Sequence, residues 1–583
     1  MRFTRRDLLK GGAAAAAVGA VGGIGACASG SGNSGGTTPT PTGPKPVTTV
    51  QQTLLRGKPG KGGYVPLVPS PGEAYLVRTD LGIKAQAGRE NRRTGTLAFA
   101  QITDVHVVDA QSPLRVEYTD RIGDPPSTNT TFNSAYRPQE MLTAQVADTM
   151  AATINAIGSG PVSGLKFGFT ISTGDIADSC QQNELRWQID ILDGAHQVVA
   201  DSGKKGTWEG VQGDDPEWYD VHYWHPDGTP AGKPEDLPKT TWGYPTVSGL
   251  MDAAMRPFTS TGIGMPWYVT FGNHDGEIQG NIPPDIPRLR EIAVGDQKVW
   301  DPPPGMSAVA FLASFVATGK IPQGTRIRTV AADPARQVLT HREFIQDHFT
   351  TTGTPVGHGF TQANIDSDTG YYTFNPVPQI RAVSLDTVNP NGGADGSLDA
   401  AQFSWLKDQL NTARTDEKLV IVFSHHTITT MENGKLADPK TEKPRVTGDQ
   451  VRELLLEYPN AIAWVNGHTH DNNIWARPKS GASGGFWEIN TASHIDWPSQ
   501  SRLIEVVDNQ DGTLSIFSTI VDFAAPAPAY DKLDTPAAIA SVAREFAAND
   551  WQDRTGYTAT VDGRRGAATD RNTELLVAKP QGF

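Results

Sequence analysis

The sequence predicts an α/β fold in which helices cover both faces of a sheet. Short apolar runs, of the length typical of buried strands, recur along the chain. Amphipathic stretches with helical spacing lie between many of them. Several of the apolar runs end in Asp, His or Asn, the residue types that bind metals or act as acids and bases. These observations together favour a large enzyme-like domain.

The first expected strands are the apolar runs 96–104 and 167–175, and a third lies within 266–275. Later strands are expected at 379–387, 418–426, 461–470, 486–493, 501–508 and 513–523.

The run 138–158 predicts an amphipathic helix that begins at Pro138. Its apolar residues recur at every fourth position: Leu142, Val146, Met150 and Ile154. A second helix is expected around Phe403 and Leu410, and a third after a capping box formed by Thr447 and Gln450.

The N-terminus, residues 1–27, has the pattern of a twin-arginine export signal. Arg5 and Arg6 precede a short, weakly apolar run that is too brief for an ordinary membrane span. The run ends in a stretch similar to a lipobox, so we expect lipidation of Cys27, with cleavage nearby and a soluble product as the alternative. The protein is therefore expected in the cell envelope, anchored to the outer face of the cytoplasmic membrane, or secreted.

The chain has only two cysteines, and this supports lipidation. A disulfide between Cys27 and Cys180 would tie a removable segment to the core, so Cys180 is expected to be a buried free thiol.

The remaining chain divides by composition. Residues 28–60 are expected to be a linker, because their first part is rich in Gly, Ser, Thr and Pro. Residues 61–527 form the expected catalytic domain, with insertions near 204–262 and 277–368, and 528–583 is a C-terminal extension with a helix at 536–549 and a polar end.

The first insertion is rich in Trp and Tyr. These side chains could stack on a base, sugar or lipid, or they could form a small core for the loop, which is the favoured interpretation. They are Trp208, Trp218, Tyr219, Tyr223, Trp224, Trp242 and Tyr244.

The formal net charge of −14 argues against a nucleic-acid polymer as partner, because there is no surplus of basic residues to neutralise phosphates. It does not exclude a small phosphorylated substrate, since bound metal ions can reverse the local field.

Five expected strand ends offer polar side chains to one edge of the fold, because ligands of open α/β sheets bind beyond the carboxyl ends of the strands. Taken singly, each has an ordinary explanation: Asp104 could cap a turn, and Gly174-Asp175 is a common turn pair. The five ends carry, in order, Asp104 and His106; Asp175 and Asp178; Asn273, His274 and Asp275; His425 and His426; and His468 and His470.

This ordered set resembles the calcineurin-like metallophosphoesterase superfamily, whose pattern is D-x-H, G-D, G-N-H-D/E, H and G-H-x-H. The resemblance covers about 96–510. It implies a four-layer αββα sandwich of two mixed β-sheets flanked by helices, and metal-dependent hydrolysis of phosphate mono- or diesters.

The resemblance also implies a dinuclear metal site. Asp104, His106 and His470 would bind the first metal, and Asn273, His425 and His468 the second, with Asp175 bridging both. Imidazole and carboxylate ligands suit Mn, Fe or Zn in the divalent or trivalent state. Two such ions would activate a bridging water as hydroxide, which attacks phosphorus.

The resemblance makes His274 the residue that stabilises the transition state or donates a proton to the leaving oxygen. Asp275 would orient His274 or cap a helix. His426 is expected to support the site or the fold. Purple acid phosphatases, a branch of the superfamily, have a tyrosine ligand where this chain has Asp178, so the metal identity stays open.

Two alternatives remain from the sequence. One is a phosphodiesterase specific for nucleotides or glycerophosphodiesters, and the other is a metal-binding envelope protein without catalysis. His494 and Arg502 could touch substrate, although roles in packing are favoured.

Overall fold

The computed structural model describes residues 46–124, 132–554 and 563–583, all within one compact unit, Pro44–Phe583. The predicted signal 1–27, the lipidation site Cys27 and most of the predicted linker lie outside these residues.

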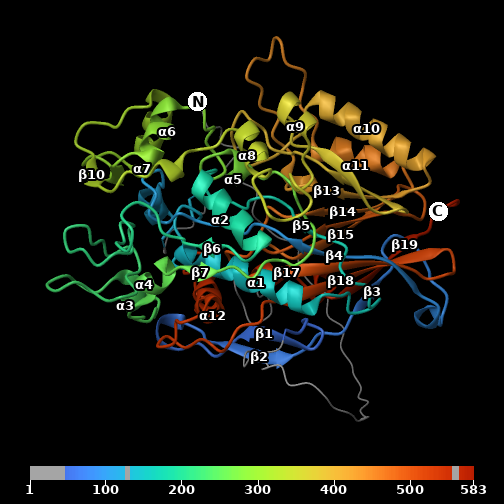
Figure 1. The fold of residues 1–583 in the computed structure, drawn as a ribbon, viewed down its shortest axis with the longest axis horizontal. Coiled ribbons are helices and arrows are strands. Elements are labelled where there is room, and N and C mark those ends of the chain that lie inside the picture. Colours follow the sequence, from blue (N-terminus) through green and yellow to red (C-terminus); the bar gives the residue numbers. More distant parts are fainter. Residues whose placement is uncertain (1–45, 125–131, 555–562) are drawn as a thin grey trace. The chain divides into compact units, whose positions relative to one another are not determined.

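Two mixed β-sheets form the centre of this unit (Figure 1). The six-stranded sheet consists, in spatial order, of β11 (Tyr372–Val377), β12 (Ile380–Ser384), β13 (Leu419–Phe423), β14 (Ala461–Asn466), β16 (Gly485–Asn490) and β15 (Asn473–Pro478). Its four central strands run parallel, and both edge strands run antiparallel to their neighbours.

The seven-stranded sheet is also mixed. It consists, in spatial order, of β3 (Leu76–Arg78), β19 (Thr573–Ala578), β18 (Thr513–Asp522), β17 (Gln500–Asp508), β4 (Thr94–Ile102), β5 (Thr170–Ser172) and β8 (Trp267–Val269). Strands β4, β5 and β8 run parallel, so their carboxyl ends lie at one edge.

Side chains alternate along the strands between an inner and an outer core, as the two-residue period of a strand requires. In β4, Leu97 and Phe99 pack between the two sheets, whereas Ala98 and Ala100 pack toward helices. Strand β13 is buried on both faces in the same way, and this explains its unbroken apolar run.

Helices cover the outer face of each sheet, which confirms the predicted four-layer αββα sandwich. The seven-stranded sheet is covered by α1 (Thr143–Ile157), α2 (Gln182–Asp193) and α12 (Pro536–Ala547). The six-stranded sheet is covered by α10 (Ala400–Thr415) and α11 (Gly448–Leu456), and α11 begins at the predicted Thr447–Gln450 capping box. Among the helices that the structure describes, none is long and apolar enough to cross a membrane.

Three predictions about the ends of elements were wrong. Helix α1 begins at Thr143 rather than Pro138, because Glu140 binds the N–H of Arg137 and holds the preceding residues in a 3₁₀ turn. The linker does not extend to residue 60, because β1 (Gln52–Arg56) pairs with β2 (Leu67–Pro71) and the Thr53 hydroxyl donates to Asp522. The C-terminal extension does not have a merely polar end, because its apolar segment forms β19 within a central sheet.

The two insertions carry short elements of their own. In the first lie α3 (Leu237–Thr241), α4 (Leu250–Met255) and β7 (Phe258–Thr259), which pairs with β6 (Gln197–Val198). In the second lie α6 (Pro287–Val294), β9 (Gln297–Asp301), α7 (Ala308–Thr318), β10 (Arg326–Thr329), α8 (His341–Asp347) and α9 (Gln362–Ser367).

Several aromatic residues of the first insertion pack in a core, as favoured from the sequence, but this core is the main one of the domain rather than a small one within the loop. Trp224, Trp242 and Tyr244 are buried in the same apolar cluster as α1 and α12. Trp242 stacks on Trp551 with ring centroids 4.5 Å apart, so the insertion packs against the C-terminal extension.

Candidate metal centre

All seven predicted metal ligands follow strands of the two sheets at a common edge. Asp104 and His106 follow β4, and Asp175 follows β5. Asn273 follows β8 and begins the short helix α5 (Asn273–Gly276). His425 follows β13, while His468 and His470 follow β14. Contacts between these side chains, given below, show that the structure brings the predicted set together.

The backbone of this edge is strained. Five of the seven ligands have left-handed conformations: Asp104 (φ 47°), His106 (φ 46°), Asp175 (φ 52°), His468 (φ 72°) and His470 (φ 59°). Such conformations cost about 1–3 kcal/mol each for non-glycine residues and persist where the surroundings enforce them, commonly at functional sites.

The glycines beside the ligands are required by close approach. A Cβ at Gly272 would lie 2.2 Å from the backbone nitrogen of Asp175, and one at Gly467 would lie 1.9 Å from Oγ1 of Thr103. Any larger residue at either position would displace a ligand loop.

The first group of ligands comprises Asp104, His106 and His470. Nε2 of His106 lies 3.2 Å from Nε2 of His470, and Nε2 of His470 lies 3.4 Å from Oδ1 of Asp104. Asp104 also accepts the N–H of His468, which connects this group to the other one.

The second group comprises Asn273, His425 and His468. Oδ1 of Asn273 lies 2.8 Å from Nε2 of His425 and 3.2 Å from Nδ1 of His468. Oδ2 of Asp175 lies 3.1 Å from Nε2 of His425 and 3.7 Å from Nε2 of His106. Asp175 therefore stands between the two groups, where a bridging ligand would be.

The donor set fits two metal ions. Nδ1 of His106 and Nδ1 of His470 each face a carboxylate and act as donors, so their Nε2 atoms present lone pairs to one another. Nδ1 of His425 donates to the carbonyl of Thr173 and leaves Nε2 facing Asp175. Buried lone pairs that converge in this way need a cation between them, and imidazole with carboxylate suits Mn, Fe or Zn.

Two carboxylates hold the histidines of the first group. Oδ1 of Asp178 lies 3.1 Å from Nδ1 of His106, and Oδ2 of Asp496 lies 2.6 Å from Nδ1 of His470. Each carboxylate also binds an arginine: Asp178 binds Arg115, and Asp496 binds Arg137. Sequence reasoning assigned no role to Asp496, which lies in an irregular loop without a motif. It placed Asp178 at a strand end, where purple acid phosphatases have a tyrosine, but assigned it no contact with His106.

His274 lies beside both His106 and Asp175. Its Nδ1 donates to the carbonyl of Asp178 over 2.7 Å, and its backbone N–H donates to Asp175 over 2.8 Å. Burial lowers the pKa of His274, but the nearby charges of Asp175 and Asp178 outweigh burial and raise this pKa to about 9.

Asp275 does not act on the ring of His274, which corrects the first of its two predicted roles. Its carboxylate accepts the backbone N–H groups of Asp175, Ile176, Ala177 and Gly272. It therefore caps the first turn of α5 by accepting the N–H of Gly272, and it fixes the loop that carries Asp175.

The remaining polar residues noted from the sequence have structural roles. Nε2 of His426 donates to the carbonyl of Ala394 and its Nδ1 bonds the hydroxyl of Thr387, so neither nitrogen is available to a metal. Arg502 is fully buried, and among its contacts are bonds to backbone carbonyls. His494 bonds Ser501, and Cys180 is a buried free thiol as expected.

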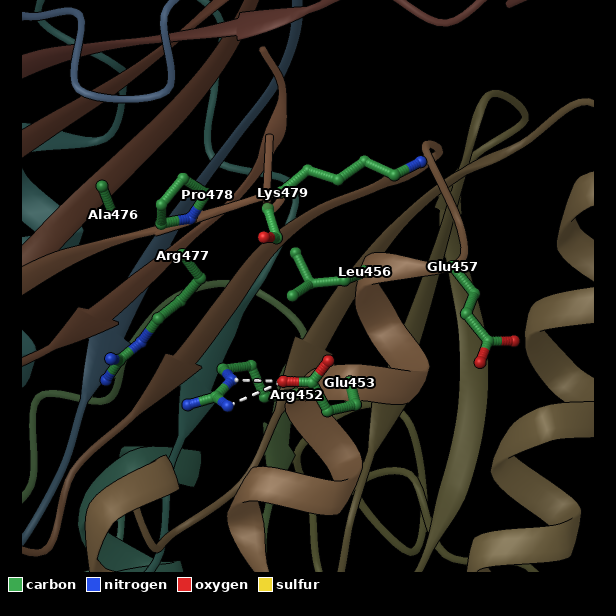
Figure 2. Close-up of a pocket in the computed structure, with 9 residues that line it drawn as sticks. Arg452, Glu453, Leu456, Glu457, Ala476, Arg477, Pro478 and Lys479 are labelled. Atoms are coloured by element: carbon green, nitrogen blue, oxygen red, sulfur yellow. Dashed lines mark hydrogen bonds and ion pairs between the residues drawn. The ribbon is translucent and has the colours of Figure 1, made fainter. Parts of the chain in front are cut away.

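A separate surface hollow of about 760 Å³ lies between α11 and the end of β15 (Figure 2). None of the predicted site residues lines it. Three of its charged side chains are paired, since Arg452 pairs with Glu453 and Arg477 with Glu488.

Comparison with known families gives one match. Residues 240–472 match the model of a family described as calcineurin-like phosphoesterase. This region includes Asn273, His425, His468 and His470, whereas Asp104, His106 and Asp175 precede it. No match was found among curated proteins.

Two solved structures are similar to this chain at low identity. A dimetal phosphatase from Danio rerio matches with 12% identity and a TM-score of 0.33, over 74% of this chain and 100% of that one. A purple acid phosphatase from yellow lupin (Lupinus luteus) seeds matches with 9% identity and a TM-score of 0.26, over 79% of this chain and 55% of that one.

Proposed function

We propose that this protein is a metal-dependent phosphoesterase that hydrolyses phosphate mono- or diesters at a dinuclear centre. The observation that carries the proposal is the convergence of two ligand groups on Asp175, with His274 beside them. The match of residues 240–472 to the calcineurin-like phosphoesterase family supports it.

In this proposal Asp104, His106 and His470 hold one metal and Asn273, His425 and His468 the other, with Asp175 shared. When bound, the two ions supply Lewis acidity toward the phosphoryl oxygens and an activated water.

His274 then acts on the leaving group. Its Nδ1 is committed to the carbonyl of Asp178, so Nε2 is the atom available to donate. To act as the donor, the ring must carry its proton on Nε2. Asp275 acts at a distance, because it fixes the loop of Asp175 through backbone N–H groups.

We further propose that the protein works in the cell envelope after export and is held there by lipid on Cys27. The support is the sequence of residues 1–27.

The test is hydrolysis by purified protein that lacks residues 1–27, with Mn²⁺, Zn²⁺ or Fe²⁺ added. p-Nitrophenyl phosphate and bis-p-nitrophenyl phosphate separate phosphatase from diesterase activity. His274→Asn should lower turnover of phenyl phosphate by about 10²–10⁴-fold. It should affect p-nitrophenyl phosphate much less, because p-nitrophenolate leaves without a proton. Protein that binds metal but hydrolyses none of these esters would contradict the proposal.

A further inference from the structure

Asp178 connects the metal centre to a buried arginine. Its Oδ1 faces Nδ1 of His106, and its Oδ2 accepts from Nη1 of Arg115 over 2.5 Å. Nη2 of Arg115 donates to Glu140 over 2.7 Å, and the Arg115 side chain is 1% exposed. The orientation of His106 therefore depends on an ion pair that water does not reach.

This ion pair belongs to a longer chain of buried charges. Oε1 of Glu117 lies 3.7 Å from Nε of Arg115 and 2.8 Å from Nζ of Lys298. Lys298 is fully buried, also donates to the carbonyl of Ser112, and belongs to β9 of the second insertion. The chain thus runs from the insertion to a predicted metal ligand.

Glu117 lies close to both Arg115 and Lys298, so Lys298 affects how strongly Glu117 attracts Arg115. Nε of Arg115 has no hydrogen-bond partner among the described residues, and Glu117 is the carboxylate next to it. A buried carboxylate that loses its partner must find another cation or take up a proton. Without Lys298, the cation within reach of Glu117 is Arg115, and moving toward Glu117 would draw Arg115 away from Asp178.

We propose that Arg115 is a positioning residue for the metal centre, and that Lys298 keeps it against Asp178 by binding Glu117. The second insertion then helps to determine how firmly His106 and His274 are held. This inference rests on the proposed function, because it takes the roles of His106 and His274 from it.

The first measurement is the affinity for Mn²⁺, by equilibrium dialysis and metal analysis, together with kcat/KM. Arg115→Met should weaken the affinity by about 10–100-fold, the usual effect of losing a residue that orients a ligand. Lys298→Met should weaken it by about 2–30-fold, since Lys298 acts on His106 through three intermediates, Glu117, Arg115 and Asp178. Glu117→Gln/Lys298→Met should restore it, because the competing carboxylate is gone.

Arg336→Met is the matched control. Arg336 is also fully buried and belongs to the same insertion, but it pairs with Asp109 and Ser202 rather than Asp178. It should lower the melting temperature and leave the Mn²⁺ affinity unchanged. If Lys298→Met does not fold, Glu117→Gln, which should keep the affinity, is compared with Arg115→Met.

Equal loss of affinity in Lys298→Met and Arg336→Met would overturn the inference, as would wild-type affinity in Arg115→Met. The inference would also be overturned if Glu117→Gln/Lys298→Met bound Mn²⁺ as weakly as Lys298→Met does. If the wild type binds Mn²⁺ but hydrolyses no ester, the proposed function fails, whereas the affinities still decide the role of Arg115.

Discussion

The two halves of the candidate metal centre are held by different kinds of contact. In the first half, His106 and His470 each donate to a carboxylate that is itself bound to an arginine. In the second half, His425 donates to the carbonyl of Thr173, and the amide of Asn273 donates to the carbonyl of Gly280. A carboxylate partner makes imidazole a more basic ligand than a carbonyl partner does.

This difference gives the two halves different charge. The first half has its own carboxylate ligand, Asp104, while the two carboxylates behind its histidines are each paired with an arginine. The second half has the neutral Asn273 in place of a carboxylate, and its share of negative charge comes from Asp175. We therefore expect the first half to bind a cation more tightly and the second half to exchange its ion more readily.

The largest expected effect comes from the residue that both halves share. Asp175→Asn should lower kcat/KM by about 10³-fold or more, because each metal supplies several kcal/mol of transition-state stabilisation. Steady-state hydrolysis of p-nitrophenyl phosphate and metal analysis are the measurements. Asp148→Asn in α1 is the control, as Asp148 is buried and accepts the N–H of Thr261 rather than contacting a predicted metal ligand. An Asp175→Asn protein with full metal content and near-normal rates would remove the bridging role.

A smaller effect is expected from a substitution that weakens metal binding in the first half alone. Asp496→Asn keeps the size of the side chain but removes the charge behind His470, so affinity for the more tightly bound ion should fall by about 10–100-fold. Titration with Co²⁺, followed by its d–d absorption, reports the two sites. The affinity of the second ion should change little. Equal weakening of both ions would mean that Asp496 stabilises the whole loop rather than one half.

The sequence predicted the ligands better than it predicted what holds them. The ligands occur in short motifs directly after apolar strands, and the carboxyl ends of neighbouring strands must meet at one edge. Asp496 and Arg115 lie in irregular segments, and their partners lie far away in the chain, so local pattern carries no sign of them. Of the two roles predicted for Asp275, orienting His274 fails for a similar reason, because its partners are backbone N–H groups, several of them from another loop.

In the fold, too, local pattern predicted individual strands but not the contacts between distant segments. Apolar runs predicted the central strands because burial on both faces leaves no polar positions, as in β13. The pairing of β19 with β18, and of β1 with β2, depends on contacts between distant segments. Composition therefore did not reveal the strands Gln52–Arg56 and Thr573–Ala578, which the structure places in segments predicted to be a linker and a polar end.

Removal of metal offers a third test of the comparison. Dialysis against increasing concentrations of a chelator should remove one ion before the other, with midpoints about tenfold apart in free-metal concentration. The intermediate should retain one ion per chain and little activity. Metal analysis and activity on the same samples check this result, and loss of both ions at a single midpoint would show that the halves are equivalent.

The smallest expected effect is on the pH dependence of stability, and it comes from two histidines away from the metal centre, His348 and His358. Their effect serves as a reference for the histidines of the metal centre. Burial and the neighbouring His358 lower the pKa of His348 to about 3, and burial lowers the pKa of His358 to about 4. Because both pKa values lie below the usual 6.5, these residues fold in the neutral form. The stability they contribute is complete above about pH 6.5 and is lost as the pH falls through about 4.

His348→Gln should reduce this loss, because glutamine does not titrate and can still donate to the carbonyl of Phe344, as Nδ1 of His348 does. Metal-free protein should melt at a temperature that falls between pH 6.5 and 4, and the fall should be smaller in the variant by roughly 2 °C. Metal-free protein is needed since the ligand histidines would otherwise add their own dependence on pH through metal release. A fall of the same size in both proteins would mean that groups other than His348 cause it, and the metal-site histidines would then be the first candidates.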